Sequence, residues 1–183
     1  VDAITIDGDS VGEVTVDGEA VFSAIPDSGL LHRYTVDESA TTSGVEDLEA
    51  DLDLSGSISS ITSDAFDGFD AAVFNASNSD NMTASKSTGV SPPYDMYMVG
   101  RLTTNDTSAF QALHDFTDTN ASSDNLKLTE DDSNPTEWEL FDGSTSAKGG
   151  SPDTNYHLFQ IESRDATNTR LLIDDTVIID NGN

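Results

Sequence analysis

The alternation of apolar and polar residues over residues 137–179 restricts the fold of this chain more than any other feature. Residues 137–143 read Glu-Trp-Glu-Leu-Phe-Asp-Gly, and residues 156–163 read Tyr-His-Leu-Phe-Gln-Ile-Glu-Ser. Successive side chains of a β-strand point to opposite faces, so this pattern is typical of strands with one buried face. Asp-Gly and Asp-Asp pairs mark the turns between them. The expected core positions are Trp138, Leu140, Phe159, Ile161, Leu172 and Ile178.

Shorter patterns of the same kind predict further strands along the chain. Strand patterns lie at residues 30–36, 94–103, 109–116 and 125–129, and at residues 58–74 around a turn at Asp67-Gly68. Residues 38–56 are polar, and the spacing of Val45, Leu48 and Leu52 fits a short helix as well as a loop. Many short strands joined by turn signals indicate an all-β sandwich or barrel.

The strand pattern at residues 94–103 carries apolar residues on both faces. Met96 and Met98 share one face with Tyr94, whereas Tyr97 and Val99 share the other. A strand that is apolar on both faces is typical of a buried, central position in a sheet. We therefore expect Tyr97 to belong to the core and not to a sugar-binding surface.

The N-terminus contains a repeat. Residues 4–11 read Ile-Thr-Ile-Asp-Gly-Asp-Ser-Val and are echoed by Val-Thr-Val-Asp-Gly-Glu-Ala-Val at residues 14–21. Asp-Gly between β-branched residues is a strong hairpin signal, so each copy predicts a hairpin. Two small hairpins cannot bury a core alone. We expect residues 1–26 to form a module that packs on the main domain, on sister subunits or on a larger particle.

The chain is strongly acidic, with 35 acidic and 7 basic residues and a net charge of −28. The acidic residues are spread along the sequence, and such a surface repels itself at low salt. Near about 1 M salt the Debye length falls to about 3 Å, which screens this repulsion. The composition resembles that of proteins from extremely halophilic archaea and their viruses. It argues against nucleic-acid binding. The sequence has no cysteine and no apolar run long enough for membrane insertion.

The order of the predicted strands resembles the concanavalin A-like lectin/glucanase jelly roll, in its laminin-G-like branch. An aromatic strand at residues 94–102 precedes a strand at residues 138–144 that ends in Asp-Gly-Ser. Tyr156-His157 then opens a strand, and Leu171-Leu172-Ile173-Asp174-Asp175 closes the pattern with Asp175 where glycine is usual. Phe66-Asp67-Gly68-Phe69-Asp70 is compatible with the family. The resemblance implies an all-β, antiparallel jelly-roll sandwich over residues 27–183, after a domain boundary at Pro26.

The chain departs from the family pattern at its C-terminal end. The family sandwich continues for further strands after the segment that matches residues 171–179, whereas this sequence ends at Asn183. We expect the last strands either to be absent or to be replaced by a partner chain or by the N-terminal hairpins.

Three carboxylates in one strand pattern raise the question of catalysis. The glucanase branch carries Glu-x-Asp-x-x-Glu, whereas Glu137, Glu139 and Asp142 form Glu-x-Glu-x-x-Asp. Retaining hydrolysis needs two carboxyl groups about 5–5.5 Å apart. Because Trp138 and Leu140 are expected in the core, the glutamates should face solvent. We therefore predict no catalytic residues and no enzymatic activity.

A cluster of aspartates offers a candidate metal site. Asp64, Asp67 and Asp70 supply the oxygen ligands that calcium prefers, and laminin-G-like domains often have a calcium at the rim. Calcium is the one cofactor that the sequence predicts, and turn formation with salt adaptation is the alternative. His32, His114 and His157 have no ligand-like spacing.

Four glycosylation sequons lie in predicted loops. They begin at Asn75, Asn81, Asn105 and Asn120. Such motifs also arise by chance in a chain rich in Asn, Ser and Thr, so a solvated loop without glycan is the alternative.

Together these patterns predict a structural virion protein of a halophilic archaeal virus: a spike, turret, tail fibre or other capsid decoration. The hairpins would join identical subunits as a trimer or pentamer and attach to other virion proteins. The jelly roll would bind host surface glycans through its loops, at the virion surface in a high-salt environment. The alternatives are a secreted or cell-surface haloarchaeal carbohydrate-binding protein and a glycoside hydrolase.

Overall fold

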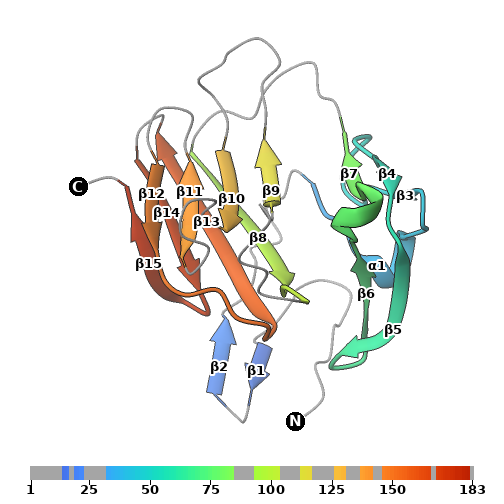
Figure 1. The fold of residues 1–183 in the computed structure, drawn as a ribbon, viewed down its shortest axis with the longest axis horizontal. Coiled ribbons are helices and arrows are strands. Elements are labelled where there is room, and N and C mark those ends of the chain that lie inside the picture. Colours follow the sequence, from blue (N-terminus) through green and yellow to red (C-terminus); the bar gives the residue numbers. More distant parts are fainter. Residues whose placement is uncertain are drawn as a thin grey trace. The chain divides into compact units, whose positions relative to one another are not determined.

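The computed structural model describes residues 14–16, 19–22, 32–84, 93–103, 112–116, 126–130, 137–141, 146–165 and 168–181. The chain divides into two compact units, residues 1–88 and residues 89–183. Both units consist of antiparallel strands (Figure 1). Within the described residues, helical structure is limited to α1 (Val36–Ser39) and the 3-10 turn η1 (Ala76–Asn78). The all-β prediction is confirmed, and none of the described helices could cross a membrane.

The first described element of the first unit is a small hairpin. Strands β1 (Val14–Val16) and β2 (Glu19–Phe22) pair antiparallel, with Val16 opposite Glu19. This pairing confirms the hairpin predicted from the second copy of the repeat. The first copy and the boundary predicted at Pro26 lie outside the described residues and stay predictions.

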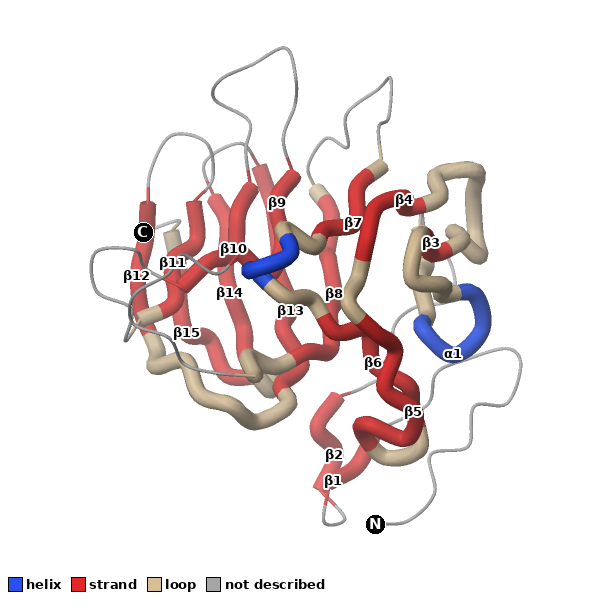
Figure 2. The backbone as a smooth tube through the Cα atoms, turned by 45° about the vertical axis from the view of Figure 1, so that its right-hand side comes forward, coloured by secondary structure: helices blue, strands red, loops and turns tan. Residues whose placement is uncertain are grey.

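The other described strands of the first unit form two small sheets (Figure 2). Strands β3 (Gly44–Val45), β4 (Leu54–Ser57) and β7 (Asn81–Thr83) form one, and the hairpin of β5 (Ser60–Phe66) and β6 (Phe69–Val73) forms the other. The hairpin confirms the predicted turn at Asp67-Gly68. The helix alternative for residues 45–52 is wrong, because Val45 lies in β3. The strand predicted at residues 30–36 is also wrong for residues 32–36, because residues 32–35 are irregular and Val36 begins α1.

A buried carboxylate explains why residues 32–35 do not form a strand. Asp47 is 5% exposed and accepts hydrogen bonds from the backbone N–H groups of Arg33 (3.0 Å) and Glu49 (3.1 Å). Its other oxygen lies 2.6 Å from His32 Nδ1. Burial alone would raise the pKa of Asp47, but His32 and the two backbone donors together lower it. Tyr34 adds a hydrogen bond to the Leu52 carbonyl (2.8 Å), and the Arg33 carbonyl accepts from the Leu48 N–H (2.9 Å). These contacts, centred on Asp47, hold the segment in place of a strand ladder.

In two hairpin turns the backbone has positive φ values, the left-handed conformation that favours glycine. Asp67 and Gly68 have φ of 49° and 88°, and Asp174 and Asp175 have φ of 48° and 61°. Two consecutive positive φ values are what a two-residue type I′ turn requires, and its twist matches that of the flanking strands. Aspartate tolerates this region better than most residues, although glycine is free of the Cβ conflict.

Replacing Asp175 by glycine is expected to raise the free energy of unfolding by a few tenths to about 1 kcal/mol. The gain in the folded state exceeds the entropy that glycine adds to the unfolded chain. The matched control is Gly68→Ala, for which no atom lies within 4 Å of the added Cβ, so that only the backbone at φ +88° is strained. It should lower stability by about 1 kcal/mol. Urea unfolding checks both, and a less stable Asp175→Gly variant would contradict the argument.

The second unit contains two four-stranded antiparallel sheets. In the first, the order β15-β14-β13-β8 joins Thr176–Asp180, Asn168–Ile173, His157–Asp165 and Tyr94–Gly100. In the second, the order β12-β11-β10-β9 joins Ser146–Gly149, Trp138–Phe141, Leu126–Glu130 and Ala112–Phe116. Neighbours in the second sheet follow one another in sequence, whereas β13 pairs with the distant β8.

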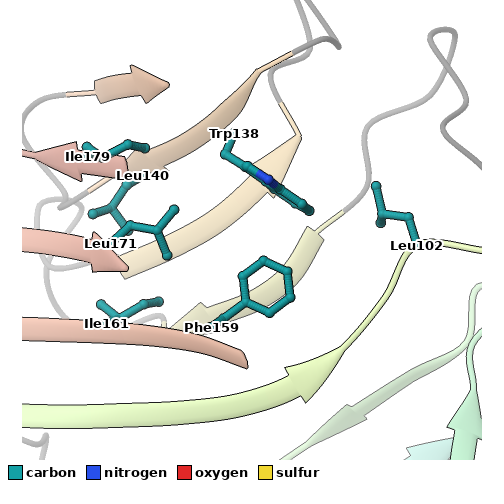
Figure 3. Packing of buried hydrophobic residues seen from close by; sticks show 7 residues of the cluster. All are labelled: Leu102, Trp138, Leu140, Phe159, Ile161, Leu171 and Ile179. Carbon is teal, nitrogen blue, oxygen red and sulfur yellow. The ribbon is translucent and has the colours of Figure 1, made fainter. Parts of the chain in front are cut away.

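The core of the second unit is formed by side chains from both sheets (Figure 3). Alternation along β11 buries Trp138 and Leu140, and alternation along β13 buries Phe159 and Ile161. The rings of Trp138 and Phe159 meet edge to face, with centroids 5.2 Å apart. The buried members of the cluster are Leu102, Trp138, Leu140, Phe159, Ile161, Leu171 and Ile179. Four of the predicted core positions are thus confirmed.

The predicted core positions Leu172 and Ile178 are wrong by one residue. Leu171 is 0% exposed and Ile179 3% exposed, whereas Leu172 is half-buried and Ile178 packs only at the edge of the cluster. The run Leu171-Leu172-Ile173 is apolar at every position, so alternation cannot decide which residues face inward. Pairing decides it, because Leu171 is opposite Ile179 and the register shifts between Leu171 and Leu172.

The outer strands β12 and β15 of the two sheets approach closely. A Cβ at Gly149 would lie 2.8 Å from the backbone oxygen of Ile178, so a residue with a side chain cannot occupy this position without a shift. This contact joins the sheets along one edge. The jelly-roll connectivity and the missing last strands stay predictions.

Candidate functional site

The sheet β15-β14-β13-β8 packs one face against the core and turns the other outward. Residues that pair across antiparallel strands lie on the same face, so the register defines both faces. We call the following side chains the outer face: Asp95, Tyr97 and Val99 of β8; Leu158, Gln160, Glu162 and Arg164 of β13; Arg170 and Leu172 of β14; Val177 and Asp180 of β15.

One end of the outer face is apolar and aromatic. A row across the strands runs from Tyr97 through Gln160 and Leu172 to Val177. Val177 is 42% exposed and Val99 is 55% exposed. The Gln160 side-chain N–H donates to the Tyr97 hydroxyl over 3.2 Å. Val99 lies two residues from Tyr97 on the same face of β8, and Val177 lies at the other end of the row. This end is therefore an exposed apolar surface with an ordered amide and phenol.

The other end of the outer face is a charged row. Asp95 is opposite Glu162, Glu162 is opposite Arg170, and Arg170 is opposite Asp180. Glu162 Oε2 accepts hydrogen bonds from Arg164 Nη2 (2.9 Å) and Arg170 Nη1 (3.4 Å). Arg170 Nε also lies 3.3 Å from Asp180 Oδ2. Both arginines of the face are thus paired with carboxylates of the same face.

Asp95 differs from the other carboxylates of the row. Burial raises the pKa of Asp95, the neighbouring Glu162 raises it further, and Arg164 only partly opposes them. Burial also raises the pKa of the Tyr97 hydroxyl, with help from Asp95, Glu162 and Asp175. The outer face therefore carries a carboxylate, Asp95, whose negative charge Arg164 balances only in part.

An open hollow of about 400 Å³ adjoins the charged end. It is lined by Pro93, Tyr94, Asp95, Glu162, Ser163 and Arg164. The hydroxyl of Ser163 is buried there and bonds Tyr94, whose pKa is raised mainly by burial. The hollow and the outer face share Asp95, Glu162 and Arg164, so they form one continuous surface.

The outer face corrects the expectation for the strand at residues 94–103. Strand β8 is at the end of the sheet order and is not central, and Tyr97 lies outside the core cluster. Tyr94, Met96 and Met98 pack against the core, as the parity of the strand requires. The second apolar face meets solvent because antiparallel sheets need only one covered face. Apolar residues on both faces were the available signal, and their interpretation as burial was wrong.

A histidine joins three segments beside the outer face. His157 Nδ1 lies 2.6 Å from Asp174 Oδ2, and His157 Nε2 lies 3.0 Å from Asp153 Oδ1. Asp174 also accepts from the Leu158 N–H (2.9 Å) and donates its own N–H to the Leu158 carbonyl (3.0 Å). This His157 clamp ties the β14–β15 turn to the start of β13. Because both ring nitrogens face carboxylate oxygens, the clamp requires the doubly protonated imidazolium.

The clamp should make stability depend on pH. Burial lowers the pKa of His157, but Asp174 and Asp153 outweigh it and raise the pKa above its ordinary 6.5. A raised folded pKa means that the contribution is complete below pH 6.5 and is lost as pH rises through the folded value. As the pH rises from 6.5 through the folded pKa of His157, we expect the free energy of unfolding of the unmodified protein to fall. In His157→Gln it should change less over the same pH range. Denaturant unfolding across pH checks this, and an equal difference between the two proteins at acid and alkaline pH would contradict it.

At acid pH the stabilisation by the clamp depends on pH in the opposite direction: it is lost as the pH falls. The backbone N–H of Asn155 lowers the pKa of Asp153 below 3.8, and His157 lowers it further. A carboxylate with a lowered folded pKa stabilises the fold above its ordinary value and loses this contribution as pH falls through the folded value. The clamp is therefore strongest between the ordinary pKa values of aspartate and histidine.

Of the three carboxylates considered for catalysis, Glu139 is held by partners on the neighbouring strand. Glu139 is opposite Lys148, whose Nζ lies 3.8 Å from Glu139 Oε2, and the Ser146 hydroxyl donates to Glu139 Oε1. Glu137 directly precedes β11 and is half-buried, while Asp142 lies outside the described residues. The geometry thus gives Glu139 a cross-strand partner in the sheet, which is the arrangement expected of a structural surface residue.

The aspartates considered for calcium take part in a turn and in hydrogen bonds with backbone N–H groups. The backbone N–H of Asp64 donates to Asp70 Oδ1 (3.1 Å), and the backbone N–H of Asp70 donates to Asp37 Oδ1 (2.8 Å). Asp67 occupies the left-handed turn position before Gly68. Across the described ranges, no three His, Asp or Glu side chains are grouped to hold a metal ion. The calcium site stays a prediction that this geometry does not support.

Two of the four sequons fall within the described residues. Asn75 is exposed, and its Oδ1 accepts from the Ser77 N–H over 2.9 Å. Asn81 lies in β7, is exposed, and donates from Nδ2 to the Ser79 carbonyl. Asn81 is thus in a strand and not in the predicted loop. Asn105 and Asn120 lie outside the described residues, as does the His114 side chain, and glycosylation at the four sequons stays a prediction.

No family model, curated protein or solved structure matches this chain. The resemblance to concanavalin A-like domains therefore stays an interpretation of short motifs, and the site must be argued from its own geometry.

Proposed function

We propose that this chain is a non-catalytic, structural protein on the surface of a halophilic archaeal virus, in a spike, turret or tail fibre, and that its second unit attaches to host surface glycans. The observation that carries the proposal is the outer face. It places Tyr97, an ordered amide and two exposed valines on one sheet, next to an open hollow. Binding sites typically combine such apolar surface with a few placed polar groups.

The chemistry of the outer face fits a sugar. The faces of a pyranose ring are lined with C–H groups that pack on an aromatic or aliphatic surface, while its hydroxyls need hydrogen-bond partners at the rim. Tyr97 offers an amphipathic ring, and Gln160 and Glu162 offer an amide and a carboxylate on the neighbouring strand. A sheet holds these groups more firmly than loops would, so little ordering is needed on binding.

The acidic surface supports the proposed setting. With a net charge of −28, the chain is suited to a solvent in which salt screens the repulsion. An attachment protein exposed to brine meets that condition. The small hairpin of β1 and β2 would serve in attachment to identical subunits or other virion proteins, since a hairpin of this size gains stability by packing on a partner.

Adsorption to host cells in molar salt tests the attachment function. The purified chain should bind cells, and Tyr97→Ala should reduce this binding at least about tenfold, as expected for a central aromatic contact. Phe74→Ala is the matched control, because Phe74 is an aromatic residue that is 50% exposed on the first unit. It should leave adsorption unchanged. Equal adsorption by both variants would contradict a role for the outer face.

Immunolabelling of purified particles tests the location. Label on the particle surface is expected. Label on the cell envelope and not on particles would instead favour a cell-surface carbohydrate-binding protein.

A further inference from the structure

We propose that the outer face binds a neutral glycan, free of carboxylate, sulfate and phosphate groups, over a four-residue block of Tyr97, Gln160, Asp95 and Glu162. This inference rests on the proposed function and specifies its ligand. The block consists of two adjacent cross-strand pairs, Tyr97 with Gln160 and Asp95 with Glu162. It lies between the exposed valines and the hollow.

The dimensions of the block suit one sugar ring. Residues two apart on a strand are about 7 Å apart on the same face, and neighbouring strands are about 5 Å apart. A pyranose ring stacked on Tyr97 therefore places its substituents over Gln160 on the next strand and over Asp95 along the same strand. The hollow beside Asp95 offers room for the next sugar of a chain.

The hydrogen-bonding groups of the block suit hydroxyl groups. Gln160 Nε2 is shared between the Tyr97 hydroxyl at 3.2 Å and Glu162 Oε1 at 3.4 Å, and the second bond is long. The carboxyl of Asp95 is flanked by Glu162, which raises its pKa in addition to burial. A hydroxyl that donates to Asp95 forms a charge-assisted hydrogen bond and brings no further negative charge to the pair.

The charges of the face disfavour an anionic sugar. Its two cations, Arg164 and Arg170, are both hydrogen-bonded to Glu162, and Arg170 is also paired with Asp180. With Asp95, the face holds three carboxylates against two guanidinium groups. Molar salt screens repulsion at long range, but at contact a sulfate or uronate must exchange its water for a donor. Taking a donor from Glu162 would leave a half-buried carboxylate without its partner, which is costly.

A second copy of the chain is the competing occupant for an exposed apolar sheet face. Its approach would bring two charged rows and two acidic surfaces together, whereas a neutral glycan adds no charge. Charge complementarity therefore favours the glycan.

The experiment uses the full chain in molar potassium chloride and isothermal titration against two sets of oligosaccharides. One set contains neutral glucose-, mannose- and galactose-based hexasaccharides, and the other contains their sulfated or uronate counterparts. We expect binding to a member of the neutral set and at least about tenfold weaker binding of its charged counterpart. Tyr97→Ala should abolish binding, and Asp95→Ala should weaken it. Phe74→Ala is the matched control, because Phe74 is an exposed aromatic residue of the first unit, outside the proposed site, and it should retain the affinity.

The other possible results of this experiment contradict different parts of the two proposals: the ligand, the site or the function. Tighter binding of the charged set would overturn the neutral ligand and leave glycan attachment standing. Neutral binding that survives both Tyr97→Ala and Asp95→Ala would overturn the site but not the function. Binding to neither set by the folded protein would overturn both proposals. Self-association in sedimentation that disappears in Tyr97→Ala would assign the face to a second copy.

Discussion

Replacing Trp138 by alanine is expected to lower the free energy of unfolding of the second unit by about 3–5 kcal/mol. Trp138 is 2% exposed and meets Phe159 edge to face, so its removal leaves a cavity between the two sheets. Neighbouring backbone cannot easily close that cavity, because β11 and β13 are held in different hydrogen-bonded sheets. The free-energy cost of the lost burial and the cost of the remaining cavity therefore add up.

Denaturant unfolding followed by circular dichroism measures this loss, since the variant lacks the only tryptophan of the chain. Phe159→Ala, which keeps Trp138 as a fluorescence probe of the same core, should show a loss of similar size. The control is Val177→Ala on the outer face, where a residue that is 42% exposed should change stability by about 0.5 kcal/mol or less. Comparable losses at Trp138 and Val177 would mean that the two sheets do not share the core.

Dilution of salt is expected to abolish the cooperative unfolding transition of the protein. The net charge of −28 is distributed over a chain of 183 residues, and the Debye length grows from about 3 Å at 1 M to about 10 Å at 0.1 M. Carboxylates that are neighbours in the fold, such as Asp95 and Glu162 or Asp64 and Asp70, then repel one another with less screening. The compact state loses stability while the expanded chain separates the same charges.

Thermal unfolding over a series of potassium chloride concentrations tests this expectation. A parallel series in sulfate at matched ionic strength separates screening from the general strengthening of apolar burial by sulfate. If screening dominates, the two series should nearly coincide at equal ionic strength. A transition temperature that stays constant or rises on dilution would contradict salt adaptation and, with it, the proposed setting.

Local patterns predicted the features that depend on neighbouring residues alone. Trp138 and Leu140 in β11 and Phe159 and Ile161 in β13 alternate with polar residues, so parity was sufficient to place them in the core. Asp67-Gly68 was recognised as a turn because type I′ geometry demands residues that tolerate positive φ. The acidic composition likewise requires no tertiary information to predict salt dependence.

Predictions that depended on distant partners were wrong or incomplete. The segment at residues 32–35 follows the buried carboxylate of Asp47, more than ten residues away, and not its own strand propensity. The burial of Leu171 in place of Leu172 follows from the register with β15. The pattern of neighbouring residues cannot predict the Asp47 contacts or the β14–β15 register, because both depend on residues that are distant in the sequence.

The sequence by itself determined that this chain forms short antiparallel strands and which faces of β11 and β13 lie in the core, and it predicts that the surface needs salt. The tertiary structure decided where the candidate site lies. Tyr97 and Gln160 are 63 residues apart and meet only because β13 pairs with β8. That pairing buries Met96 and Met98 and leaves the opposite face of the strand to solvent, since a two-layer arrangement covers each sheet on one side only.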